Sequence, residues 1–173
     1  MFGLLKRKPD PAPEGPVQFD VAVEIEKPAA EVYALLDWAD PRNAKRQLGH
    51  HIEALEGEPK RFRLIMTEMP EHRFDMTMLS EEPGRAYAFV TDIQPPVGRL
   101  DSDEEHYSLE PLGEGRCNLK LTTIAVFRRG LNMREFEQEL AMMMMACQRA
   151  LIKLKLHAEE GLEAVKALEA EIG

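Results

Sequence analysis

The sequence predicts one α+β domain, in which a curved antiparallel sheet of about seven strands wraps around a long C-terminal helix. Apolar and polar side chains alternate over residues 17–27, which is typical of a strand with one buried face. Further short segments of β character fill residues 50–128 and are separated by turns rich in Gly and Pro. Apolar side chains then recur at helical spacing over residues 132–160.

Two short helices are expected directly after the first strand. The strand should end at Pro28, and apolar side chains at helical spacing predict a helix over residues 29–38. Asp40 followed by Pro41 has the pattern of an N-cap and a first helical residue, and Gly49 would end that second helix.

The region that follows should form an antiparallel meander. Several of its segments alternate, as Phe74, Met76 and Met78 do, and tight turns join them. The predicted strands lie near residues 50–56, 61–69, 72–80, 85–92, 104–112 and 116–128.

The last segment has a clear helix start. Asn132 and Glu135 have the spacing of a capping box, and Leu131 and Phe136 occupy the two positions of a hydrophobic staple. An apolar stripe continues from there, and Gly161 is expected to interrupt the helix.

These elements divide the chain into three parts. Residues 1–16 are expected to be a flexible Pro-rich tail, residues 17–160 the domain, and residues 161–173 a C-terminal helix extension. Residues 1–8 combine apolar and basic side chains and would support at most a weak peripheral contact with a membrane.

Charge and cysteine content argue against several classes of function. The net charge is −9, with 22 Lys and Arg against 31 Asp and Glu, which argues against binding nucleic acid through a basic face. The two cysteines form neither a disulfide framework nor a zinc motif, and no cofactor or metal is expected. The N-terminal residues lack the order of a secretory signal, so a cytoplasmic location is expected. Composition does not predict the oligomeric state.

Two stretches carry a resemblance to a known family. Residues 25–37 read Ile-Glu-Lys-Pro-Ala-Ala-Glu-Val-Tyr-Ala-Leu-Leu-Asp, and residues 107–115 read Tyr-Ser-Leu-Glu-Pro-Leu-Gly-Glu-Gly. With the element order, they make residues 17–160 similar to the START-like (SRPBCC) superfamily, in its polyketide cyclase/dehydrase-like branch. The resemblance implies the helix-grip fold and a hydrophobic small-molecule ligand, such as a lipid or a polyketide-like ring, bound in a cavity between sheet and helix.

Methionine is the most distinctive component of the predicted interior. Its flexible, polarisable side chain conforms to ligands of varied shape, although the same residues could simply fill a core. Inward-facing Tyr and Thr hydroxyls could orient a ligand or serve structural hydrogen bonds. The candidate ligand-binding residues are Met66, Met76, Met78, Tyr87, Phe89, Tyr107, Thr123, Met143, Met144 and Cys147.

No catalytic motif is found. None of the five histidines stands out, and the acidic stretch of residues 101–105 is interpreted as the solvated beginning of a strand. Binding or carriage of a hydrophobic molecule is therefore the leading hypothesis, and catalysis is left open. One alternative is a cyclase or dehydratase, which needs a buried acid/base pair, and the other is a protein-interaction or regulatory module.

Overall fold

The computed structural model describes residues 10–172, in which seven strands form one sheet in the order β1-β7-β6-β5-β4-β3-β2. Every neighbouring pair is antiparallel, so the predicted fold class is confirmed. The strands are β1 (Pro16–Ile25), β2 (His51–Leu55), β3 (Arg61–Ile65), β4 (Arg73–Glu82), β5 (Ala86–Gln94), β6 (Leu100–Pro111) and β7 (Cys117–Phe127). The helices are α1 (Ala29–Leu36), α2 (Ala44–Gln47), α3 (Met133–Glu160) and α4 (Leu162–Ile172).

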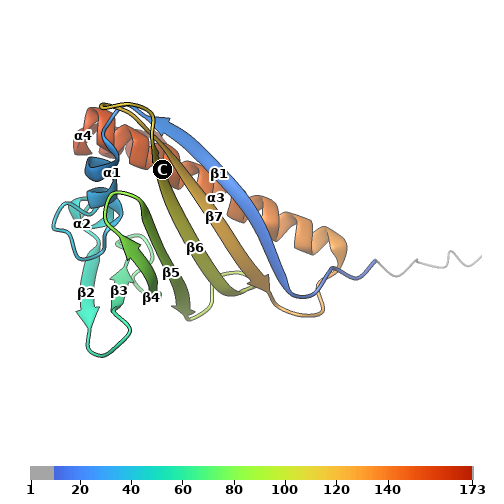
Figure 1. The fold of residues 1–173 in the computed structure, drawn as a ribbon. Coiled ribbons are helices and arrows are strands. Elements are labelled where there is room, and N and C mark those ends of the chain that lie inside the picture. Colours follow the sequence, from blue (N-terminus) through green and yellow to red (C-terminus); the bar gives the residue numbers. More distant parts are fainter. Residues whose placement is uncertain (1–9, 173) are drawn as a thin grey trace, which may run out of the picture.

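The curved sheet packs against the long helix α3. Helix α3 runs alongside β1 and β7, while α1, α2 and α4 gather near its C-terminal end (Figure 1). The consecutive strands β2 to β7 form the meander that the tight turns predict, and β1 pairs with β7 from Pro16 opposite Val126 to Ile25 opposite Cys117. The first and last strands of the chain are therefore neighbours, and they lie at the edge of the sheet that contacts α3.

The ends of α3 follow the sequence prediction. The Asn132 side chain accepts a hydrogen bond from the Glu135 amide at 3.0 Å, and the Glu135 carboxylate accepts one from the Asn132 amide at 3.1 Å. Gly161 has φ = 92°, a conformation that favours glycine, and it separates α3 from α4.

The start of α2 differs from the prediction. Asn43, rather than Asp40, caps this helix, and its side chain accepts hydrogen bonds from the amides of Lys45 and Arg46. Asp40 is used differently because its carboxylate accepts hydrogen bonds from the amide and guanidinium of Arg42, which closes a local turn instead.

The contact between the N-terminal segment and the domain begins before residue 17. The Ala12 amide donates to the Leu131 carbonyl at 2.9 Å, and the Met133 amide donates to the Asp10 carbonyl at 2.8 Å. Strand β1 itself begins at Pro16. The predicted membrane contact of residues 1–8 falls outside the described residues. None of the helices in residues 10–172 combines the length and the apolar character that crossing a membrane requires.

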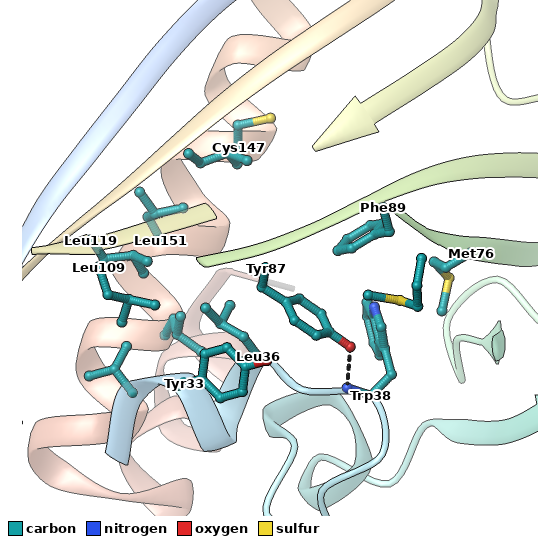
Figure 2. Packing of buried hydrophobic residues seen from close by; sticks show 14 of the residues in the cluster. Tyr33, Leu36, Trp38, Met76, Tyr87, Phe89, Leu109, Leu119, Cys147 and Leu151 are labelled. Carbon is teal, nitrogen blue, oxygen red and sulfur yellow. Dashed lines mark hydrogen bonds between the residues drawn. The ribbon is translucent and has the colours of Figure 1, made fainter. Parts of the chain in front are cut away.

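Two clusters of buried side chains lie between the sheet and α3. The larger contains residues from α1, the strands and the C-terminal half of α3, and Figure 2 shows part of it. The smaller lies near the start of α3, where Phe136 packs edge-on against Phe127 with ring centroids 5.8 Å apart. Met143 contacts both clusters.

Candidate functional site

A cavity of about 380 Å³ lies inside the larger cluster. Its wall is contributed by the sheet, by the α1–α2 segment, by the C-terminal half of α3 and by α4. Most of that wall is apolar, which suits an apolar small molecule. Its apolar side chains include Leu35, Leu36, Leu64, Met66, Phe74, Met76, Phe89, Ile93, Leu121, Met143, Leu151, Leu154 and Val165.

The structure brings most of the candidate residues together at this cavity. They reach it from four strands or strand ends and from α3, because alternation along each strand directs every second side chain to the same face. The candidates at the cavity are Met66, Met76, Phe89, Tyr107, Met143 and Cys147. Whether they contact a ligand stays a prediction.

Four candidates lie elsewhere. Met144 is 39% exposed on the outer side of α3, because consecutive helical residues point about 100° apart and Met143 takes the inward position. Met78 is buried in the core next to the cavity, and Thr123 is buried with its hydroxyl 3.6 Å from the Cys147 sulfur. The fourth, Tyr87, has a structural role.

The Tyr87 hydroxyl holds the loop that follows α1. It accepts a hydrogen bond from the Trp38 amide at 2.9 Å (Figure 2) and donates one to Asp37 at 3.4 Å. The Tyr87 ring also packs edge-on against Tyr33 and Phe89. These contacts use both hydrogen-bonding functions of the hydroxyl within the protein.

A row of three polar side chains on β6 faces the cavity. Asp103, Glu105 and Tyr107 are two residues apart, so they share one face of the strand, and all three contribute to the cavity wall. The Tyr107 hydroxyl donates to a Glu105 oxygen at 2.6 Å, and Glu105 is also hydrogen-bonded to Asp103. The interpretation of this acidic stretch as solvated is therefore wrong for Asp103, which is 8% exposed, while Glu105 is half-buried at the cavity wall.

Asp103 is held in its protonated form near neutral pH. Burial, and then the neighbouring Glu105, raise the pKa of Asp103 to about 8, and burial also raises the pKa of Glu105. Hydrogen bonding between two carboxyl groups requires that one of them be protonated. Asp103 consequently acts as donor to Glu105, while Tyr107 donates from the other side.

Cys147 is not an activated nucleophile. Burial, followed by the charge of Glu105, raises the pKa of its thiol to about 12, so it stays protonated and behaves as a small apolar wall residue.

Basic side chains enter the cavity from the helices. Lys45 comes from α2, and Lys153 and His157 come from α3. Lys153 is paired with Glu169 at 2.7 Å. His157 donates from Nε2 to Gln47 at 2.7 Å, and burial lowers its pKa, so the ring is neutral. Its buried Nδ1 has no hydrogen-bond partner among the described residues.

The histidine at the cavity does not form an acid/base pair with a carboxylate, since its partner is Gln47. Within residues 10–172, no group of His, Cys, Asp and Glu side chains is arranged to hold a metal ion. The chemical capacity of the site therefore rests on the β6 carboxyl pair and on Lys45.

Sequence reasoning missed Asp103, Glu105 and Lys45. For the two acids a signal was present, because Tyr107 was placed inward and the period of two puts Glu105 and Asp103 on the same face. The charge of the two acids, which is typical of exposed residues, favours the solvated interpretation over the one that the spacing indicates. For Lys45 the sequence held no comparable signal, since a four-residue helix shows no periodicity.

Similar solved structures share this architecture. Ara h 8.0201 aligns with a TM-score of 0.63 at 13% identity over 83% of this chain and 98% of its own. The Zhui aromatase/cyclase from Streptomyces sp. R1128 aligns at 0.54 with 19% identity over 91% and 94% of the two chains. A START superfamily protein from Mycobacterium smegmatis aligns at 0.51 with 13% identity over 79% and 98%.

No family model matches the chain, and no curated protein does. The likeness is thus one of fold, and it confirms the helix-grip architecture that the element order predicts.

Proposed function

Because the chain has the START-like helix-grip fold, we propose that it binds a largely apolar small molecule, such as a lipid or a polyketide-like compound, in the cavity between the sheet and α3. The cavity carries the proposal: about 380 Å³ of space is lined mostly by apolar side chains, with Met, Phe and Leu among them. Protein interiors are usually close-packed, and cavities of this size are typical of ligand-binding sites.

The polar side chains at the wall favour a ligand with a few polar substituents. The row of Asp103, Glu105 and Tyr107 offers both hydrogen-bond donors and acceptors along one side of an otherwise apolar space. A few placed polar groups are what orient a ligand in such a site. The methionines would adapt to the shape of its apolar part.

Native mass spectrometry of protein purified from its own host tests this proposal. We expect a small molecule to remain bound, and we expect Nile red, a neutral dye that fluoresces in apolar surroundings, to compete with it. Absence of both a retained molecule and dye binding would contradict the proposal.

A cyclase or dehydratase is the second candidate, and the β6 carboxyl pair favours it. A pKa of about 8 keeps Asp103 protonated at neutral pH, where it would serve as the general acid, and the neighbouring Glu105 would act as the base. Removal of a hydroxyl as water needs such a donor next to the substrate.

The two candidates differ in what a variant retains. Glu105→Gln keeps the shape of the side chain but removes the base. If the protein is a dehydratase, this variant should retain a compound heavier by one water than the compound found on the wild type. Identical masses on both proteins would support a binder without catalysis. The third alternative, an interaction module, stays a prediction.

A further inference from the structure

Lys45 differs from the other basic side chains at the cavity. Lys153 is neutralised by Glu169, and several lysines on the surface are likewise paired. No carboxylate among the described residues lies within 4.0 Å of the Lys45 ammonium, and no described side chain or carbonyl accepts a hydrogen bond from it. The chain has nine more acidic than basic residues, so this is not a shortage of carboxylates.

The backbone that carries Lys45 is firmly held. Asn43 accepts hydrogen bonds from the amides of Lys45 and Arg46, and its own amide group donates to the Leu36 carbonyl at 3.0 Å. The Arg46 guanidinium donates to the carbonyls of Trp38 and Ile52, each at 3.1 Å. Neighbouring residues thus fix the local structure, whereas the Lys45 side chain makes none of these contacts and points to the cavity.

The Lys45 side chain is half-buried at the cavity wall, where its ammonium group would gain from direct contact with an anion. Burial lowers the pKa of Lys45, which means that the charged form is the one penalised. The carboxylates whose charges act on it are those of Glu68, Glu105 and Glu169, and Lys153 opposes them. None is in ion-pair contact with Lys45, so a ligand anion would supply a contact that the described residues do not.

We propose that Lys45 anchors the acidic group of the ligand, so that the cavity takes an amphipathic organic acid with its carboxylate at α2 and its apolar body against the Met and Phe wall. This inference rests on the proposed function and specifies its ligand class. The β6 row lies on the same wall, where Asp103, Glu105 and Tyr107 offer hydrogen-bond donors and acceptors to neutral polar substituents of that ligand.

Calorimetry with three ligands of one chain length tests the proposal. Decanoate, 1-decanol and decylamine share an apolar tail and differ in the charge of the head group. For the wild type at neutral pH we expect decanoate to bind at least about tenfold more tightly than decanol, the size of effect typical of a hydrogen bond to a charged group. Decylamine should bind most weakly.

The matched variants are Lys45→Met and Lys153→Met. The first should lose the preference for decanoate and keep its affinity for decanol within about twofold, while the second, which removes a cavity lysine already paired with Glu169, should keep the preference. Lys45→Arg should also keep it, because the charge is retained. Circular dichroism of each variant verifies that it is folded.

The outcomes distinguish a failure of the Lys45 anion site from a failure of the proposed ligand binding. Equal binding of decanoate and decanol by the wild type, or an undiminished preference in Lys45→Met, would overturn the role of Lys45 while leaving an apolar binder. A preference for decylamine would assign recognition to Asp103 and Glu105 and equally refute the anion site. If none of the three binds although Nile red does, the inference fails and the proposed function stands, whereas failure of Nile red and of all three ligands to bind overturns both.

Discussion

The two ends of the space between the sheet and α3 are built differently. Near the start of the helix, Phe136 and Leu140 project towards the sheet and pack against Phe127 and its neighbours, which fills that end. Further along the same helix, the cavity lies against Ala146, Cys147 and Ala150. Small side chains at these three positions of α3 contribute to the space there, beside the larger Met143, Leu151 and Leu154 of the same wall.

This difference shows that one helix face can pack closely against the sheet at one end and border a cavity at the other. Large side chains at the filled end contribute stability, and small ones at the hollow end leave room for a ligand. Met143 lies at the boundary, where it contacts both clusters.

The largest effect is expected at the filled end. Phe136→Ala should lower the free energy of unfolding by about 3–5 kcal/mol, because it removes a buried ring and its edge-on contact with Phe127. Urea denaturation measures the change. Binding of Nile red by the folded variant should be unaltered, and a loss of dye binding at a temperature where the variant is folded would show that the two ends are not independent.

The hollow end should make stability depend on pH. The folded-state pKa of Asp103, about 8, lies above the ordinary value of 3.8, so the folded protein holds a proton that the unfolded chain loses. Stability from this group therefore falls as pH rises from about 4 to about 8.

Asp103→Asn removes this titration and keeps a donor for Glu105. We expect the variant to match the wild type near pH 4 and to be more stable by on the order of 2 kcal/mol near pH 8. Urea denaturation across this pH range provides the comparison. A constant difference at all pH values would mean that Asp103 is not held protonated by the fold.

Met143→Trp tests the boundary between the two ends, because it places a larger side chain at the edge of the cavity. A larger side chain directed into the cavity should weaken Nile red binding by about tenfold or more, with little change in stability. The matched change Leu140→Trp, at the filled end, should instead cost about 1–3 kcal/mol through overpacking. Equal stability losses in both variants would mean that the space at Met143 is too small to accept a ligand.

The smallest effect concerns the N-terminal segment. Deletion of residues 1–12 removes the backbone hydrogen bonds of Asp10 and Ala12 with Leu131 and Met133, and leaves β1 whole. We expect a loss of about 1 kcal/mol, because a hydrogen bond contributes little net stability. Thermal unfolding measures it, and a much larger loss would show that this segment supports the filled end.

The fold was largely predictable because its signals are local. Alternation over residues 17–27, the capping box of Asn132 and Glu135, and Gly161 each indicate one element without reference to the rest of the chain. The error at Asp40 was of the same local kind, since Asp40 and Asn43 are both good caps and only the competing contacts with Arg42 decide between them.

The candidate site was predictable only where apolar pattern and inward direction agree. Met66, Met76 and Phe89 follow from alternation, and Met143 follows from the helical stripe. Asp103 is a buried acid: its charge predicts an exposed side chain, whereas its spacing from Tyr107 predicts an inward-facing one. Lys45 reaches the cavity because Asn43 and Arg46 fold the α1–α2 segment back over it, a tertiary effect that no local pattern records.

The run Met142–Met145 gives the molecule a set of built-in spectroscopic reporters. Its inner member, Met143, lies at the cavity, whereas Met142, Met144 and Met145 are exposed on α3. Methyl groups of methionine are few, mobile and well separated in NMR spectra, and the chain has ten of these residues. Isotope labelling of this one amino acid therefore places probes both inside the wall and on the outer surface of a single helix, within one turn of each other, so that occupancy of the interior and events at the exterior can be followed in the same spectrum.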